Sequence, residues 1–321
     1  MTTTKPPSAT QAATRDAVRR QLQGKGPSLG ASAFKFFLIA MLLTSLAILI
    51  VLLSDLLISA WPTFRDRGLD FVTSGLSLNP ETAGVWTGIV GSLGIALTVI
   101  LVAVPVGIGA AIYLEEYAPD NNLTRWIDTT VRNLAGVPSI VFGLLGLAIF
   151  VVVVNAIGLG GSTAGKNVIA AGITMAALVL PIVIITSAEA IRAVPHTIRE
   201  AGYGVGATKW EVIQSHVVPS ALPGILTGTV LTLARAIGET APLLVIGVAT
   251  GYFGASVDAT FFEKLTGPYT ALPVIVFSWS RQTDPAFADT LAPAAIIVLL
   301  AVLFTLNAVA IYFRNRFEKK W

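Results

Sequence analysis

Long apolar runs separated by short polar segments dominate this 321-residue chain. A helix needs roughly 20 apolar residues to cross a bilayer, because about 30 Å of hydrocarbon is crossed at about 1.5 Å per residue. Six runs are long enough, and they occupy 34–57, 86–114, 134–157, 167–187, 217–250 and 291–313. A soluble protein would expose these runs, so we predict an all-α membrane protein with six transmembrane helices.

The basic residues predict which side of the membrane each loop faces. Of the 21 Lys and Arg residues, 15 fall in segments on the side of the N-terminus, five fall on the other side, and Arg235 falls within a span. Cytoplasmic loops carry the excess of Lys and Arg, so both termini are predicted to be cytoplasmic. The expected inner loops are 115–133 and 188–216, and the expected outer loops are 61–85, 158–166 and 251–290.

The ends of the chain lie outside the predicted membrane domain, which we assign to 34–315 with its core at 85–315. Residues 1–33 are rich in Pro, Gly, Ser and Thr and are expected to form a mobile cytoplasmic tail. Within it, TRDAVRRQLQ is either solvated, which we favour, or a short basic helix on anionic headgroups. Residues 316–321 are expected to form a short cytoplasmic tail. The first apolar run is too long for the core of a signal peptide.

Two loops contain further structure. In the inner loop 115–133, Leu123, Trp126, Ile127 and Thr130 recur at helical spacing, which predicts an amphipathic helix at the membrane surface. The outer loop 251–290 contains TALPVIVFSWS, which is apolar but too short to cross, and we expect a re-entrant or interfacial segment.

Small residues within the spans predict close helix packing, since in lipid they let helix backbones approach one another. The positions concerned are Gly91, Gly94 and Ala96 in the second span and the GxxxG pair Gly224 and Gly228 in the fifth. The pattern supports a helix bundle without identifying a partner.

Composition and motifs exclude several chemistries. The chain has no cysteine, which excludes disulfides and thiolate metal sites. His196 and His216 lie outside any HExxH frame, and no GxSxG elbow occurs, so a hydrolase is not expected. The net charge of +3 needs no nucleic-acid partner, because the basic residues sort by membrane side.

A glycine-rich segment, GLGGSTAGKN, resembles a phosphate-binding loop at Gly160, Gly165 and Lys166. Asn167 stands where a Ser or Thr should hold magnesium, and the loop is expected to face outward, away from ATP. We therefore predict a flexible turn, and no ATPase site within this chain.

Two opposite charges lie inside the fifth apolar run, in ARAIGETAPLLVIG. An arginine at mid-depth in a bilayer costs on the order of 3 kcal/mol on insertion scales. Glu239 follows Arg235 by four residues, so the two side chains share a helix face and can pair. A buried pair stabilises poorly compared with apolar residues, which favours a polar pathway over a purely structural lock. A guanidinium offers a planar fork of donors suited to an oxyanion.

Two places in the spans can interrupt a helix. Gly238 can end one helix and Thr240 can cap the next, with Pro242 in its first turn. The AGVPS segment offers a similar break at Gly136 and Pro138, followed by Ser139. Broken helices at mid-depth often direct their N-terminal ends at anions, whereas a simple proline kink is the alternative. The candidate pathway residues are Arg235, Glu239, Thr240 and Ser139.

The inner loop 188–216 resembles the EAA signature, EAA-x3-G-x9-I-x-L-P, of binding-protein-dependent ABC permeases. The matching residues are Glu200, Ala201, Gly206 and Pro219, whereas Gly202, His216 and Val218 depart from the signature. The resemblance implies a coupling helix that inserts into a separate ATPase subunit. Glu200, Ala201, Gly202 and Gly206 are the candidate docking residues.

Four further segments make the resemblance more specific: AIYLEEYAPDN, AGVPSIVFGLLGL, ARAIGETAPLL and TALPVIVFSWS. Together they are similar to the phosphate-specific transport (Pst) permeases, and GETAPLL and TALPV are closer to the PstA-type subunit. The similarity covers about 85–315. It implies a type I ABC importer permease fold in the bacterial plasma membrane, importing inorganic phosphate.

The same resemblance implies the partners and cofactors. These are a companion PstC-type permease, two PstB-type ATPase subunits, an external PstS-type phosphate-binding protein and membrane lipid. The chain itself is expected to bind no cofactor, while ATP and Mg would be used by the ATPase subunits. Two alternatives stay open: a permease for another oxyanion such as molybdate or sulfate, and a proton-coupled secondary carrier using Glu239.

Overall fold

The computed structural model describes residues 29–248 and 266–317, in which every regular element is helical. The long helices are α2 (Leu29–Arg67), α4 (Trp86–Ile112), α8 (Val168–Arg192), α11 (Val218–Gly238) and α15 (Ala292–Phe317). The shorter α-helices are α3 (Asp70–Thr73), α5 (Asn122–Ala135), α6 (Ser139–Leu145), α7 (Val151–Val154), α9 (His196–Gly204), α10 (Lys209–Val212), α12 (Ala241–Ile246) and α14 (Leu272–Trp279). The π-helical segments are η1 (Tyr113–Tyr117), η2 (Gly146–Phe150), η3 (Asn155–Leu159), η5 (Ile213–Val217) and η6 (Ala286–Leu291), and η4 (Gly161–Thr163) is a 3-10 turn.

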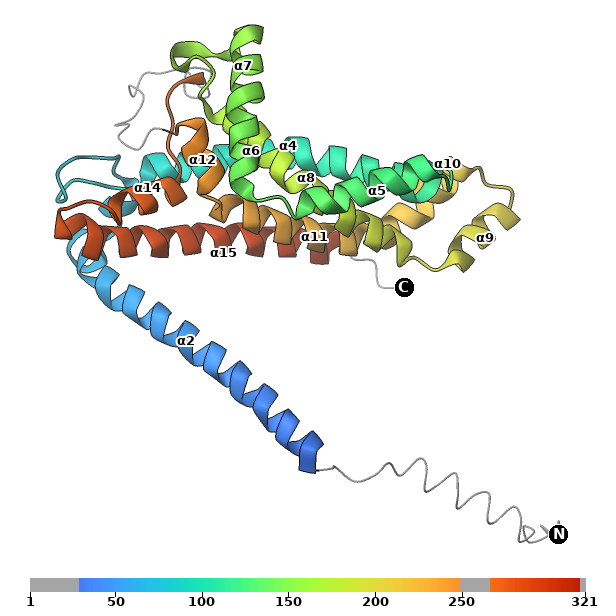
Figure 1. Cartoon of the computed structure of the whole chain (residues 1–321), viewed down its shortest axis with the longest axis horizontal. Coiled ribbons are helices and arrows are strands. Elements are labelled where there is room, and N and C mark those ends of the chain that lie inside the picture. Colours follow the sequence, from blue (N-terminus) through green and yellow to red (C-terminus); the bar gives the residue numbers. More distant parts are fainter. Residues whose placement is uncertain (1–28, 249–265, 318–321) are drawn as a thin grey trace. The chain divides into compact units, whose positions relative to one another are not determined.

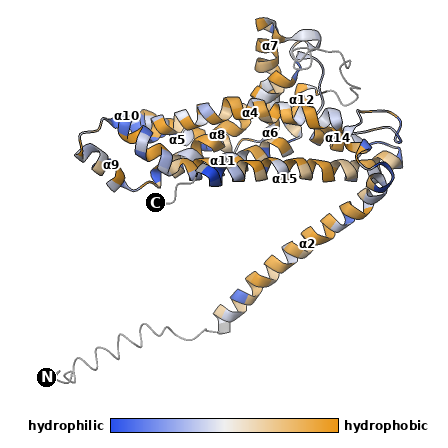
Figure 2. Cartoon of the chain, turned by 180° about the vertical axis from the view of Figure 1, so that it is seen from behind, coloured by the Kyte–Doolittle hydropathy of each residue, from blue (hydrophilic) through white to orange (hydrophobic). Residues whose placement is uncertain are grey.

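Six helical segments are long and apolar enough to cross a membrane, which confirms the predicted number. They are Gly30–Arg67, Trp86–Tyr117, Ser139–Leu159, Val168–Arg192, Lys209–Gly238 and Ala286–Arg316. Apolar residues cover the long helices along most of their length (Figure 2). The sidedness of the two termini stays a prediction.

The chain divides into two units, residues 1–55 and residues 56–321. The described part of the first unit belongs to α2, which begins at Leu29, so residues 29–33 are helical. At its other end α2 extends past the predicted limit of 57 to Arg67. It ends there because Gly68 adopts a left-handed φ of 52° and its N–H bonds the Phe64 carbonyl. The interpretations of residues 1–28 and 318–321 lie outside the described residues.

In the second unit α4, α8, α11 and α15 run alongside one another (Figure 1). Glycines allow close helix contacts, as predicted. A Cβ at Gly224 would lie 2.8 Å from the Ala190 Cβ, and one at Gly228 would overlap the Thr186 side chain. Met175 and Val179 of α8 are fully buried in the largest apolar cluster, to which α4, α6, α11, α12 and α14 also contribute.

The third apolar run is interrupted at its start and not at mid-depth, which corrects the predicted span of 134–157. Residues 134 and 135 belong to α5, and α6 begins at Ser139 after Pro138. Proline disfavours helical backbone at the preceding residue and donates no N–H, so the chain changes direction there. From Ser139 the helix continues through η2 and α7 into η3, where Gly158 leaves the helical backbone with a φ of 82°. In Figure 1 this helix crosses the direction of α4 and α8.

The fifth run, predicted over 217–250, is interrupted within its described residues. α11 ends at Gly238, Glu239 is extended with φ −80° and ψ 124°, and α12 starts at Ala241. Pro242 lies in the first turn of α12, where its missing N–H costs nothing. The break predicted at Gly238 is therefore present, and it places Arg235 in the last turn of α11.

Both predicted short elements are helices. α5 matches the amphipathic segment, and its first turn is capped by Asn121 Oδ1, which accepts from the Thr124 N–H at 2.9 Å. Leu123 and Trp126 are exposed, and Ile127 is partly buried. α14 forms most of TALPVIVFSWS and packs on α15 and α4, with Leu272 and Ile275 buried.

Gly91→Ala is expected to destabilise the protein, because the added methyl group would overlap the carbonyl oxygen of Thr270. Overpacking of this kind costs about 1–3 kcal/mol. Gly109→Ala is the matched control in the same helix, since a Cβ there meets no atom within 4 Å and alanine is the better helix former. Thermal unfolding in detergent should show a lower midpoint for Gly91→Ala only. Equal midpoints for the two variants would contradict this packing.

Candidate functional site

Arg235 and Glu239 form an ion pair at the break between α11 and α12. The Arg235 Nε lies 3.4 Å from the Glu239 Oε1, longer than the roughly 2.7–2.9 Å of a tight charge-assisted hydrogen bond. The Arg235 side chain is 49% exposed and that of Glu239 is 21% exposed. The guanidinium therefore lies at the surface of the chain beside an interrupted helix, held loosely by its carboxylate.

Thr240 occupies the N-cap position of α12, but its side chain makes no capping hydrogen bond, so the predicted capping role is wrong. Its backbone is helical, with φ −103° and ψ −39°, whereas a capping residue has extended backbone. The Thr240 carbonyl accepts from the Leu244 N–H at 3.1 Å. The partly buried Thr240 directly follows Glu239 at the break.

The two helices that follow the breaks pack against each other. A Cβ at Gly143 of α6 would lie 2.7 Å from the Cα of Pro242 in α12. Ser139 starts α6 one turn earlier and is partly buried. Thus α6, which begins at Ser139, packs against α12, which follows Glu239 and Thr240.

Asn167, the residue that breaks the phosphate-loop pattern, has a structural role. Its Oδ1 accepts from the Ala170 N–H at 3.1 Å, and its Nδ2 donates to the Leu159 carbonyl at 2.7 Å. The side chain is fully buried and caps α8. An N-cap therefore accounts for asparagine at this position.

The predicted docking residues lie on α9 and the turn that follows it. Glu200 and Ala201 are exposed. Gly202 is buried, and a Cβ there would lie 2.7 Å from the Val212 Cγ2, so the loop's own packing requires glycine. Gly206 adopts a φ of 85°, which explains glycine at the turn between α9 and α10.

A groove of about 370 Å³ opens between α9 and the η5–α11 segment. It is lined by Ile198, Ala201, Gly202, Val205, His216 and Ser220. Three large apolar side chains of the same loop are exposed: Tyr203 (45%), Val205 (84%) and Trp210 (59%). These three were not predicted from the sequence, although an exposed apolar residue within a polar loop is a signal for an interface.

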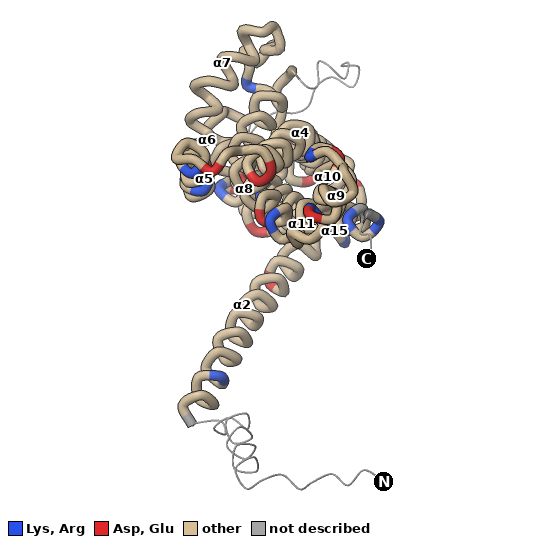
Figure 3. The backbone as a smooth tube through the Cα atoms, turned by 90° about the vertical axis from the view of Figure 1, so that its right-hand side faces the viewer, with Lys and Arg blue, Asp and Glu red and all other residues tan. Residues whose placement is uncertain are grey.

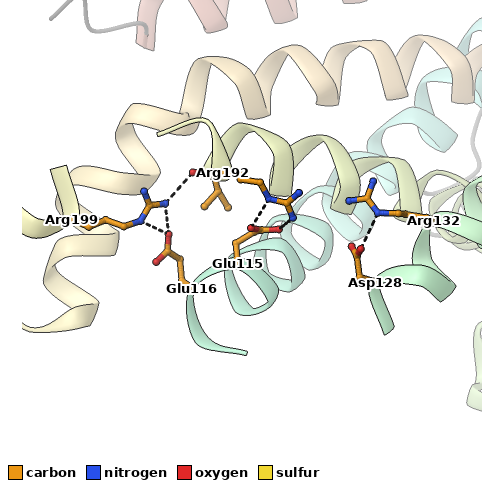
Figure 4. Close-up of polar contacts among 7 residues, drawn as sticks. Glu115, Glu116, Asp128, Arg132, Arg192 and Arg199 are labelled. Atoms are coloured by element: carbon orange, nitrogen blue, oxygen red, sulfur yellow. Dashed lines mark hydrogen bonds and ion pairs between the residues drawn. The ribbon is translucent and has the colours of Figure 1, made fainter. Parts of the chain in front are cut away.

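A set of ion pairs between η1 and the 188–216 loop was also not predicted from the sequence. Charged residues gather at this end of the unit (Figure 3). Glu115 receives two hydrogen bonds from Arg192, and Glu116 receives two from Arg199 (Figure 4). Two adjacent glutamates at the end of an apolar span were the available signal. Their partners, 77 and 83 residues away, could not be read from the chain.

Residues 103–321 match the family described as binding-protein-dependent transport system inner membrane component. Several curated proteins are similar over most of the chain. The phosphate transport system permease protein PstA 1 of Mycobacterium tuberculosis (strain CDC 1551 / Oshkosh) is 33% identical over 261 residues, 80% of this chain and 76% of that protein. The probable ABC transporter permease protein YqgI of Bacillus subtilis (strain 168) is 30% identical over 82% of this chain and 88% of its own length.

A PstC protein of the phosphate transport system, from Mesorhizobium japonicum, is also 30% identical, over 85% of this chain and 88% of that protein. Two solved structures share the fold. An inward-facing MetNI methionine ABC transporter has a TM-score of 0.53 at 16% identity, covering 74% of this chain and 95% of its own. A bacterial ABC transporter for import of the polysaccharide alginate has a TM-score of 0.54 at 15% identity, covering 89% and 98%.

Single cysteines provide a direct test of the exposed face of α11, because the chain has no cysteine of its own. Arg235→Cys should react with a charged thiol reagent on the order of tenfold faster than Ile237→Cys, because Ile237 is only 4% exposed. The purified chain in detergent is the sample, and mass spectrometry follows the labelling. Equal rates would contradict the placement of Arg235 at the surface.

Proposed function

Given that this chain belongs to the binding-protein-dependent transport system inner membrane component family, we propose that it is the permease subunit of an ATP-driven importer of inorganic phosphate. It is a multi-pass protein of the plasma membrane. The names of the PstA and PstC relatives support phosphate as the substrate. The observation that carries the proposal is the exposed Arg235 beside Glu239 at the break of α11.

The guanidinium of Arg235 would bind the oxygens of a phosphate ion as the ion passes. The guanidinium can donate two parallel hydrogen bonds to one oxyanion, and it stays charged at any physiological pH. Glu239 would neutralise it while the pathway is empty. Because their contact is long, at 3.4 Å, an arriving anion competes with a weakly held carboxylate. The same carboxylate repels the bound anion, which keeps binding weak enough for release.

Thr240 and Ser139 would supply hydroxyl groups near the same position. Each lies at the start of a helix that follows a break, and these two helices pack together at Gly143 and Pro242. Backbone N–H groups at such helix starts favour anions. In the proposed pathway a companion PstC-type permease contributes the opposite wall.

Energy would enter through the 188–216 loop. The loop has a groove beside α9 and exposes the apolar side chains of Tyr203, Val205 and Trp210, which offer apolar area of the kind that a partner subunit covers. Two PstB-type ATPase subunits would dock there, one on each permease, and use ATP and Mg. An external PstS-type binding protein would deliver phosphate to the opposite side. α11 begins beside the groove and ends beside Arg235, so it would connect the two sites.

Arg235→Ala should lower phosphate uptake about tenfold to a hundredfold, the loss expected when a charge-assisted hydrogen bond is removed. Arg235→Lys should lie between Arg235→Ala and the wild type, because it keeps the charge without the fork. Glu239→Gln should abolish or uncouple transport. Uptake of labelled phosphate by whole cells, corrected for the amount of membrane protein, is the measurement.

Leu231→Ala, one turn before Arg235 and 68% exposed, is the matched control and should transport normally. Normal uptake by both Arg235→Ala and Glu239→Gln would remove the pathway assignment. Uptake of sulfate or molybdate in place of phosphate would assign the pathway to another oxyanion.

Val205→Arg should prevent the ATPase from co-purifying with the permease, because a charge would replace an apolar side chain at the centre of the docking surface. The control is Leu69→Arg, which is equally exposed (80% against 84%) at the other end of the unit. Affinity purification of the complex from membranes, with quantification of the ATPase, is the measurement. Equal ATPase recovery in both variants would contradict docking at this loop.

A further inference from the structure

We infer that Glu116 is a positioning residue that ties the docking helix α9 to the end of α4, so that movement of α9 reaches the second span directly. The inference rests on the proposed function in one respect, namely that an ATPase moves α9. The covalent chain connects α9 only to α8 and to the α10–α11 segment. The Glu116 contact would add a third connection, to a helix 83 residues away in sequence.

The guanidinium of Arg199 donates hydrogen bonds to three segments of the chain. The Nε and one terminal nitrogen of Arg199 both donate to Glu116 Oε1, at 3.0 and 2.7 Å (Figure 4). The other terminal nitrogen donates to the Val194 carbonyl at 2.8 Å, and the first donates also to the Ile191 carbonyl at 3.1 Å. One guanidinium on α9 thus holds η1, the last turn of α8 and the α8–α9 link together.

Burial distinguishes this pair from its neighbours. The side chains of Arg199 and Glu116 are 14% and 7% exposed, whereas those of Arg192 and Glu115 are 59% and 17% exposed. An exposed pair contributes little, but removing one partner of a sheltered pair leaves an uncompensated charge. Removing the Glu116 carboxylate is therefore expected to have a large effect, and removing the Glu115 carboxylate a small one.

The local backbone explains how adjacent residues reach different elements. Residues 113–117 form a π-helical turn, in which the Ala118 N–H bonds the Tyr113 carbonyl at 2.8 Å. Such turns often occur at functional sites. Glu115 meets the end of α8, Glu116 meets α9, and the Tyr117 ring lies 5.1 Å from the Lys209 ammonium at the start of α10. Three consecutive residues therefore contact three successive parts of the 188–216 loop.

An apolar cluster beside the ion pairs makes the assembly rigid. Ala111 of α4 packs there with Ile191 and Val194 near the end of α8 and with Val212 and Val217 at the start of the fifth span. Arg199 anchors α9 to this cluster through Val194 and Ile191 as well as through Glu116. A pull on α9 is then shared among α4, α8 and α11 and is not absorbed by bending of the loop.

The experiment uses the complete complex, with companion permease and ATPase, in lipid vesicles. A reporter thiol is introduced on α11 by Leu231→Cys, a position that is 68% exposed, and its labelling rate is compared with and without ATP. ATP hydrolysis and phosphate uptake are measured on the same samples. The reporter follows conformational change without depending on which anion is carried.

Glu116→Gln should keep ATPase binding and hydrolysis while the ATP-dependent change in labelling and the uptake per ATP fall on the order of tenfold. Arg199→Lys, which keeps the charge but loses the fork, should show a smaller loss. Glu115→Gln is the matched control and should stay within about twofold of the wild type. The exchange Glu116→Arg with Arg199→Glu should recover part of the coupling.

Full ATP-dependent labelling in Glu116→Gln would overturn the inference. Loss of ATPase binding in both Glu116→Gln and Arg199→Lys would also overturn it, since the pair would then only shape the docking surface. A wild-type complex that shows ATP-dependent labelling but imports no phosphate would refute the proposed substrate alone.

Discussion

Hydrocarbon offers no water to hydrogen-bond a backbone amide or carbonyl, and each unsatisfied group there costs several kcal/mol. A chain that crosses a bilayer six times must therefore keep its backbone in helices, and any interruption must be sheltered by other parts of the protein. At the break that follows α11, Glu239 and Thr240 are partly buried. The segment 136–138 and the segment 239–240 each lead into a helix, and those helices, α6 and α12, pack on one another at Gly143 and Pro242.

The break at 239–240 gives Arg235 its chemical setting. In an unbroken helix Glu239 would lie one turn beyond Arg235 on the same face and could pair closely. Here the helix ends at Gly238, Glu239 is extended, and the pair opens to 3.4 Å with half of the arginine side chain exposed. A loosely paired guanidinium suits transient contact with an anion better than a closed ion pair does.

α11 joins the two functional regions of the proposed importer. Its first turn contributes Ser220 to the groove beside α9, and its last turn carries Arg235. A helix of 21 residues spans about 30 Å, so it can act as a rigid rod between them. The small residues Gly224 and Gly228 set this rod closely against α8. The ion pairs of η1 lie at the groove end, where rigidity matters for transmitting force.

The sequence alone determined the number of spans, the helix α5 and the four-residue spacing of Arg235 and Glu239. These features follow from hydrophobic length, helical period and local motifs, all of which are written in neighbouring residues. Only the tertiary structure decided that α11 stops at Gly238, that Thr240 does not cap α12 and that Asn167 does cap α8.

Gly202 and Glu116 show most clearly why the sequence alone could not decide such features. Glycine at 202 invites an explanation by a partner subunit, but Val212 of the same loop already occupies the space a side chain would need. Glu116 looks like an ordinary charge at the end of a span until the fold brings Arg199 within 2.7 Å of it. Long-range partners are set by packing of the whole bundle, and no local pattern in the sequence encodes them.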